Sequence, residues 1–220
     1  MSGEARAVLF DFGGVLTSSV IDGFCDFSEE ATGDRRLVLD LVAHDADVSA
    51  ALVQIETGTL DEEGFERRLC AALAARGVEI APAGLLRRMQ GHLRRDAAMV
   101  ELVAAVRARG IAVGLVSNSL GRDTYAGYDL AAMFDAVVIS AQEGVRKPSR
   151  GLYEIACDRL GVRPEQAIMV DDLEQNIVAA RRLGMDGIVH RDAATTRDAL
   201  AALLALDPTD LTPSPVEVTP

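Results

Sequence analysis

The sequence predicts an α/β protein with a doubly wound parallel sheet and an α-helical segment inserted after the first strand. Short apolar runs of strand length alternate with amphipathic helical segments between residues 96 and 206, the pattern of βαβ units. Between residues 17 and 95 the apolar periodicity is helical throughout. We therefore expect a Rossmann-like core of residues 1–16 and 96–206, a helical insertion of residues 17–95 and a flexible C-terminal tail of residues 207–220.

The first elements follow from local patterns. Residues 5–10 form a short apolar and β-branched run, which predicts a buried strand. In the insertion, apolar residues recur at helical spacing over residues 35–44. A capping box at residues 59–62 predicts the start of a helix that ends at Gly77. Residues 82–89 predict another helix.

Helices and strands then alternate along the rest of the chain. Glycines at positions 110, 161 and 184 mark the ends of three of the helices, since glycine accepts the left-handed backbone that often ends a helix. The predicted helices cover residues 96–109, 121–132, 149–160, 173–183 and 195–206, and the predicted strands cover residues 111–116, 136–140, 166–170 and 187–190.

Composition narrows the functional classes. The chain has 220 residues, 49% of them apolar, which is enough for one well-buried core and a smaller module. The net charge is −12, and the longest Lys/Arg clusters are pairs. This charge argues against nucleic acid or an anionic membrane as the main partner. We expect a monomer or a homodimer.

Cysteine usage and hydropathy bear on the compartment. The three cysteines, Cys25, Cys70 and Cys157, are far apart in the chain, and we interpret them as buried, reduced thiols. No basic and apolar leader precedes the first strand, and no apolar run approaches the ~20 residues that span a bilayer. We therefore expect a cytoplasmic protein.

Polar side chains gather where the predicted strands end. In an open parallel sheet, the carboxyl ends of the strands share one crevice, where ligands bind. Three carboxylates in that crevice need a hard cation, usually Mg²⁺, and a nearby ammonium and hydroxyl would then face a phosphoryl group. The residues concerned are Asp11, Ser117, Asn118, Lys147, Asp171 and Asp172.

The order and spacing of these segments resemble the haloacid dehalogenase superfamily of aspartate-nucleophile hydrolases, most of which are Mg²⁺-dependent phosphatases. The resemblance runs from about Val8 to Val189. It implies that the insertion is a C1-type cap, as in subfamily I, and that Mg²⁺ is the cofactor. It also implies a small phosphorylated metabolite as substrate, such as a sugar- or nucleotide-like monophosphate, hydrolysed through an aspartyl-phosphate.

The resemblance assigns three catalytic residues. Asp11 would be the nucleophile, although an Asp at this position also starts many turns. Ser117 would hydrogen-bond a phosphoryl oxygen with the Asn118 amide beside it, whereas an ordinary helix cap is the alternative interpretation. Lys147, the only lysine of the chain, would offset the negative charge of Asp11 and the phosphoryl group. The alternative interpretation of Lys147 is an ordinary solvated charge on the surface.

The resemblance also assigns a metal site. Asp11, the backbone carbonyl of Gly13 and Asp172 would bind Mg²⁺. Asp171 and Asn176 would orient these ligands and Lys147. Paired Asp residues at a helix start often serve only as caps that complement the helix dipole.

Position 13 departs from the usual pattern of the family. The motif is commonly Asp-x-Asp, and here it is an Asp-x-Gly-Gly variant with Gly13 in place of the second Asp. That side chain normally acts as general acid and base, a contribution of ~10²- to 10⁴-fold. Cap residues that contact the substrate are expected near residues 17–24 and in the turn at residues 56–58.

Two alternative functions follow from the same residues. A 2-haloacid dehalogenase also uses an Asp nucleophile under a helical cap, but it needs no metal and no paired Asp. Asp171 and Asp172 therefore favour the phosphatase. A degenerate protein that only binds a phosphorylated ligand or a partner would explain Gly13, but not the retention of Asp11, Ser117, Lys147 and Asp172 together.

Overall fold

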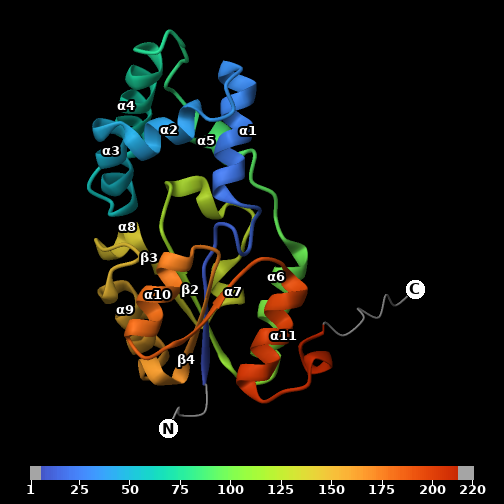
Figure 1. Ribbon diagram of the computed structural model, residues 1–220. Coiled ribbons are helices and arrows are strands. Elements are labelled where there is room, and N and C mark those ends of the chain that lie inside the picture. The colour runs from blue at the N-terminus through green and yellow to red at the C-terminus, as the bar shows by residue number, and fades with distance from the viewer. Residues whose placement is uncertain (1–5, 213–220) are drawn as a thin grey trace.

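A five-stranded parallel sheet forms the base of the molecule (Figure 1). The structure is a computed structural model, and it describes residues 6–212. The strand order is β3-β2-β1-β4-β5, so that β1 lies at the centre between β2 and β4. The predicted α/β class is confirmed. The strands are β1 (Ala7–Phe10), β2 (Ala112–Ser117), β3 (Ala136–Ile139), β4 (Ala167–Asp171) and β5 (Asp186–Val189).

Helices cover both faces of the sheet, which is why the strands are apolar without a polar side. Along β1, Val8 and Phe10 point to one face and pack with α6 and α11, whereas Leu9 points to the other and packs with α9 and α10. Two apolar layers therefore enclose the central strand. The helices are α6 (Ala97–Ala108), α11 (Ala193–Leu204), α9 (Arg150–Leu160) and α10 (Glu174–Arg182).

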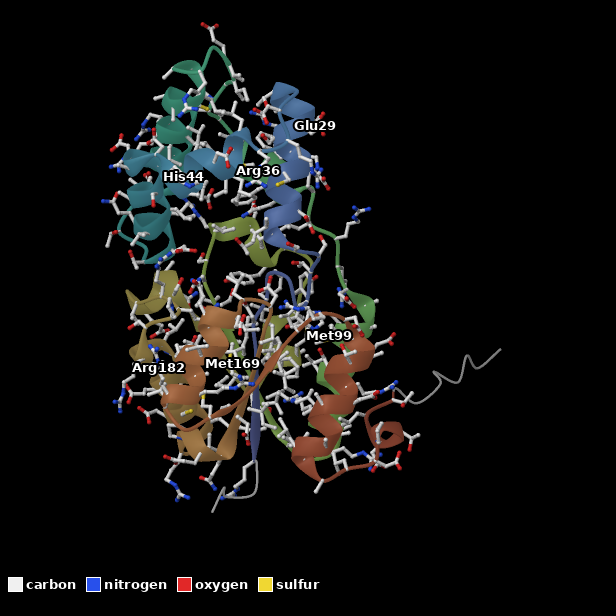
Figure 2. The ribbon with its side chains drawn as sticks, in the orientation of Figure 1. Glu29, Arg36, His44, Met99, Met169 and Arg182 are labelled. Carbon is white, nitrogen blue, oxygen red and sulfur yellow. The ribbon has the colours of Figure 1, made fainter. Side chains whose placement is uncertain are left out.

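The helical insertion stands above the carboxyl ends of the strands (Figure 1). It has its own cluster of buried residues, including Phe24, Phe65 and Leu69, apart from the clusters on the sheet. In Figure 2, Glu29 lies in this upper part, whereas Met169 lies on the sheet below. The insertion contains α1 (Val20–Thr32), α2 (Leu37–His44), α3 (Ala46–Glu56), α4 (Glu62–Ala74) and α5 (Leu85–Gln90).

The two chain crossings between the insertion and the core lie side by side. Thr17 and Arg95 form an isolated antiparallel bridge, and the Asp96 N–H donates to the Leu16 carbonyl at 2.9 Å. The separate apolar cluster and the paired crossings support the predicted division at residues 16–17 and 95–96, which stays a prediction.

The start of α4 differs from the sequence-based expectation. Its cap is Asp61, whose carboxylate accepts a hydrogen bond from the Gly64 N–H at 2.8 Å. The Thr59 hydroxyl instead donates to the Gln54 carbonyl at 3.2 Å. The predicted capping box at residues 59–62 is therefore wrong, because Asp61 lies three residues before a free N–H and serves as the cap.

The C-terminal segment is also more ordered than expected. Pro208–Leu211 forms the 3₁₀ helix η3, and Leu211 is buried in the cluster formed with α6 and α11. Asp210 forms an ion pair with Arg109 at 2.7 Å. The prediction of a flexible tail is wrong for these residues, because one leucine anchors a segment that is otherwise rich in Pro, Thr and Asp. Residues 213–220 of the predicted tail lie outside the described residues.

The remaining elements are short. The helix expected over residues 121–132 is two separate pieces, because Gly127 between them has a φ of +84°. The short elements are η1 (Arg122–Tyr125), α7 (Leu130–Met133), α8 (Ser140–Glu143) and η2 (Pro164–Gln166).

Cys25, Cys70 and Cys157 are buried and form no disulfide, as predicted. Over residues 6–212, none of the helices has the length and apolar character needed to span a bilayer.

Candidate active site

Lys147 joins two carboxylates at the carboxyl end of the sheet. Its Nζ lies 2.7 Å from Asp11 Oδ1 and 2.7 Å from Asp171 Oδ2. Asp11 directly follows β1 and Asp171 ends β4, so the neighbouring strands bring the two carboxylates to one point. All three side chains are buried. The lone lysine is therefore a buried charge held by neighbours, which excludes the solvated alternative.

Electrostatics keep this lysine charged. Burial alone would lower the pKa of Lys147, but the charges of Asp11 and Asp171 raise it above its ordinary value. Burial raises the pKa of the Asp11 carboxyl, and the Lys147 ammonium acts against that rise. A protonated lysine therefore lies beside Asp11 at this end of the sheet.

Asp171 is fully engaged within the protein. The Asn176 amide donates to both of its carboxylate oxygens, at 2.8 and 3.0 Å, and the Leu173 N–H donates to one of them at 2.9 Å. Lys147 supplies the remaining contact. This leaves Asp171 as a residue that orients Lys147, with Asn176 holding it in place.

Asp172 is the carboxylate left free to bind a metal. It is partly buried, and this burial, with the charge of Asp171, raises its pKa to about 6. Oxygen atoms of Asp11, Asp171 and Asp172 lie within 4.8 Å of one another. With all three carboxylates ionised, they and the one ammonium give the site a net charge of −2. Such a set of oxygen donors and charges suits a hard divalent cation such as Mg²⁺.

The two glycines after Asp11 shape the metal end of the site. Gly14 has a φ of +75°, and a Cβ there would lie 2.2 Å from Asp172 Oδ2. Only glycine permits this approach of the loop to Asp172. Gly13 has no such backbone constraint, but a Cβ there would lie 2.6 Å from Val20 Cγ2. Val20 therefore occupies the space next to position 13.

The side chain of Asn118 is committed to Lys147. Its Oδ1 accepts from the Lys147 N–H at 2.8 Å, and its Nδ2 donates to the Lys147 carbonyl at 3.2 Å. The expectation of an amide directed at a phosphoryl group does not match these bonds. Asn118 instead holds the backbone of Lys147 in place.

Ser117 is buried at the end of β2 beside a tyrosine that the sequence analysis missed. The Tyr125 hydroxyl donates to Ser117 Oγ at 3.0 Å, and burial raises the pKa of Tyr125 to about 12, so its proton is retained. Tyr125 and Tyr128 also pack edge-on against Phe12, each at 4.8 Å between ring centroids. No local pattern around residues 122–125 distinguishes this tyrosine from a core residue.

A cavity of about 200 Å³ lies between these residues and the insertion. Val20, Ile21, Phe24 and Glu56 line it, within the two segments from which cap contacts were predicted. The contribution of α2 and the middle of α3 was not predicted. The other lining residues are Leu39, Val42, Leu52, Asp11, Gly13, Asn118, Leu120, Lys147, Asp172, Leu173 and Asn176. Ser117 is not among them.

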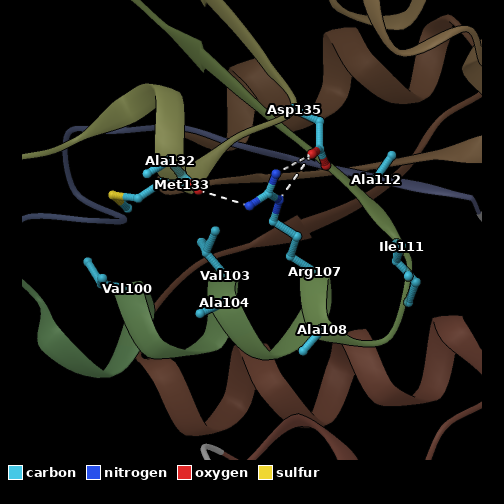
Figure 3. A pocket seen from close by; sticks show the side chains of 11 residues that line it. Val100, Val103, Ala104, Arg107, Ala108, Ile111, Ala112, Ala132, Met133 and Asp135 are labelled. Carbon is cyan, nitrogen blue, oxygen red and sulfur yellow. Dashed lines mark hydrogen bonds and ion pairs between the residues drawn. The ribbon is translucent and has the colours of Figure 1, made fainter.

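A larger cavity of about 770 Å³ between α6 and the sheet edge does not compete with this site (Figure 3). It contains none of the predicted site residues. Its one cation, Arg107, is already bonded to Asp135 at 2.8 and 3.0 Å and to the Ala132 carbonyl at 2.9 Å. This pair links α6 to the loop before β3, which is a structural role.

Solved structures share the fold. A HAD-like hydrolase of Porphyromonas gingivalis aligns with a TM-score of 0.71, at 21% identity over 93% of this chain and 100% of its own. A HAD family enzyme of Bacteroides thetaiotaomicron, in complex with magnesium and inorganic phosphate, aligns at 0.61 with 17% identity over 85% and 94%. An L-2-haloacid dehalogenase of Xanthobacter autotrophicus aligns at 0.62 with 18% identity over 90% and 84%. Fold alone therefore does not separate the two chemistries.

Sequence comparison identifies the family. The sesquiterpene phosphatase astK of Aspergillus oryzae is 28% identical over 199 residues, which is 87% of this chain and 92% of that protein. The profile of the haloacid dehalogenase-like hydrolases matches residues 5–184. The match covers most of the chain and the three carboxylates of the candidate site, and the protein therefore belongs to the haloacid dehalogenase-like hydrolase family.

Proposed function

We propose that this protein is a Mg²⁺-dependent phosphatase that hydrolyses a small phosphate monoester through an aspartyl-phosphate on Asp11. The observation that carries the proposal is the arrangement of the Asp11 carboxylate. Its Oδ1 accepts from the Phe12 N–H at 2.6 Å and contacts Lys147 Nζ at 2.7 Å. Its Oδ2 accepts no hydrogen bond from the described residues and belongs to a residue that lines the cavity. One oxygen is fixed, and the other is available as a nucleophile.

Asp11, the Gly13 carbonyl and Asp172 would hold Mg²⁺. When bound, the ion neutralises charge on the phosphoryl oxygens. The charge of −2 described above fits a divalent cation, and Gly14 leaves room for Asp172 to approach the loop. Asp171 is saturated by Lys147, Asn176 and the Leu173 N–H and therefore serves in orientation.

The chain's own residues account for the two steps. Asp11 Oδ2 forms a bond to phosphorus while the bond from phosphorus to the ester oxygen breaks, and the leaving group departs with the electron pair. Water then attacks the aspartyl-phosphate and releases phosphate and the free carboxylate. Lys147 stays protonated through both steps and offsets the negative charge on Asp11 and the phosphoryl group.

The alternatives have less support. The name of the Aspergillus oryzae relative specifies phosphatase chemistry. A dehalogenase has no use for the paired Asp171 and Asp172, whereas this protein encloses both beside the nucleophile. A degenerate binding protein would not need Asp11 Oδ2 free within a cavity that also contains Lys147.

Acetyl phosphate tests the proposal, because its small leaving group places no demand on the cavity wall. We expect hydrolysis with Mg²⁺, none with EDTA, and none from Asp11→Asn, which keeps the shape of the side chain without the nucleophilic oxygen. Full turnover by Asp11→Asn or by the metal-free protein would refute the mechanism. Halide release from 2-chloropropionate without metal would support the dehalogenase instead.

A further inference from the structure

The cap side of the active-site cavity is an apolar wall. Val20, Ile21 and Phe24 come from α1, Leu39 and Val42 from α2, and Leu52 from α3. Two more leucines, Leu120 and Leu173, continue the wall on the core side. The catalytic carboxylates and Lys147 form the opposite end, so the cavity is polar where a phosphoryl group would lie and apolar where its organic group would lie.

Apart from the carboxylates and Lys147 at the polar end, the cavity has three polar side chains, and each has a partner in the protein. Glu56 forms an ion pair with Arg146, both polar atoms of Asn118 are bonded to the Lys147 backbone, and the Asn176 amide donates to Asp171. A sugar or nucleoside held against this wall would find few partners to replace the hydrogen bonds that its hydroxyl groups form with water. The lining therefore disfavours the sugar- or nucleotide-like substrate that the family resemblance implies.

Exposure of the wall supports a ligand rather than a folded core. Ile21 is 46% exposed and Leu173 is 37% exposed, and both line the cavity, one from the cap and one from the core. A large apolar side chain in water costs free energy that burial against an apolar ligand would recover. An apolar group bound between them would cover surfaces of both modules.

We propose, on the basis of the phosphatase function argued above, that the substrate is a phosphate monoester of a small hydrocarbon or aromatic alcohol with few or no hydroxyl groups beyond the esterified one. The cavity of about 200 Å³ is smaller than the ~300–1,000 Å³ of sites for drug-sized ligands. The cavity therefore suits an organic group about the size of one ring. A longer hydrocarbon chain would extend out of the cavity between Ile21 and Leu173.

A matched pair of substrates tests this inference. Cyclohexylmethyl phosphate and glucose 6-phosphate both carry the phosphate on a CH₂ attached to a six-membered ring, and both release a primary alkoxide. They differ chiefly in the ring oxygen and hydroxyl groups. We expect kcat/KM to favour cyclohexylmethyl phosphate by about tenfold or more, since apolar pockets discriminate ~10- to 200-fold per contact of this kind. Equal values, or a preference for glucose 6-phosphate, would overturn the inference.

Two substitutions on the cap test whether the apolar wall causes the preference for cyclohexylmethyl phosphate. Ile21→Ser is expected to lower the ratio of the two kcat/KM values about tenfold, because it replaces part of the wall with a hydroxyl. Val53→Ser is the matched control, since Val53 is 39% exposed on α3 but does not line the cavity. It should leave the ratio and the acetyl phosphate rate unchanged. An unchanged ratio in Ile21→Ser, with a thermal unfolding profile like that of wild type, would refute the assignment of the wall.

The acetyl phosphate assay separates this inference from the proposed function. If acetyl phosphate is hydrolysed and cyclohexylmethyl phosphate is not preferred, the phosphatase stands and the apolar substrate is wrong. If acetyl phosphate is not hydrolysed, the phosphatase itself is wrong. In that case, binding of the two esters to Asp11→Asn by calorimetry still measures the preference, and tighter binding of glucose 6-phosphate would overturn it.

Discussion

The missing acid at position 13 can be restored only if Val20 is changed as well. A Cβ at Gly13 would lie 2.6 Å from Val20 Cγ2, closer than side-chain atoms approach, although the backbone there is not left-handed. Gly13→Asp alone is therefore expected to displace Val20 and to place the new carboxylate poorly. In Gly13→Asp with Val20→Ala, the two methyl groups are gone and the carboxylate has room.

The magnitude follows from what general acid catalysis contributes. Without an acid, the departing oxygen leaves as an alkoxide or takes a proton from water or the substrate, so wild-type rates should fall steeply as the pKa of the leaving group rises. A well-placed acid contributes ~10²- to 10⁴-fold for poor leaving groups and little for good ones. We expect the double variant to accelerate alkyl phosphates within that range and to leave aryl phosphates nearly unchanged.

The assay measures kcat/KM with Mg²⁺ over a series of aryl and alkyl phosphates whose leaving groups differ in pKa. The controls are wild type, Gly13→Asp and Val20→Ala, each with its thermal unfolding profile. Because Val20 is only half-buried, Val20→Ala should lower the free energy of unfolding by about 1 kcal/mol or less, and the variant should fold. A shallow slope in wild type would mean that another group supplies the proton. Glu56, the other carboxylate that lines the cavity, would then be tested as Glu56→Gln.

Two further predictions concern the metal site and the C-terminal segment. Asp172→Ala should weaken Mg²⁺ binding in a metal titration more than Asp171→Ala, since a residue that orients a ligand typically tunes affinity ~10- to 100-fold and a direct ligand more. Asp171→Ala should cost more stability in urea, about 3 kcal/mol, because it breaks a buried ion pair; the reverse ranking in both assays would exchange the two roles. Leu211→Ala should lower the free energy of unfolding by about 2–5 kcal/mol, and no change would mean that η3 does not anchor the C-terminal segment.

The sheet could be predicted because a local sequence pattern identifies each strand. Residues 7–10 form an apolar run that is followed by Asp11, and residues 167–171 form one that ends in Asp171. The rules for parallel sheets place these strand ends together. The contacts of Lys147 with Asp11 and Asp171 were expected from the family resemblance and not from the strand pattern, because Lys147 does not end a strand. The start of α4 could not be predicted in the same way, because Thr59 and Asp61 are both good caps. In the structure Thr59 bonds to Gln54, at the end of α3, and Asp61 caps the helix.

The site was predictable where it rests on strand ends and not where it rests on packing between modules. Asn118 carries the same sequence signal whether its amide faces a phosphoryl group or the backbone of a residue 29 positions later, and only the fold decides. The approach of Val20 to Gly13 joins a loop of the core to a cap helix. No sequence pattern encodes that distance.

Val20 links the absence of an acid at position 13 to the apolar wall of the cavity. It fills the space beside position 13, and it forms part of the apolar wall of the cavity. A carboxylic acid at position 13 would have to be buried against Val20 and its neighbours, where an ionised carboxylate is costly. An apolar substrate and a missing acid are therefore compatible, because the same side chain that would contact the organic group excludes the acid.

If Gly13→Asp with Val20→Ala hydrolyses alkyl phosphates faster than wild type, it should also lose preference for cyclohexylmethyl phosphate, since the new charge lies against the wall. Restored acid catalysis with an unchanged preference would show that the two features are independent.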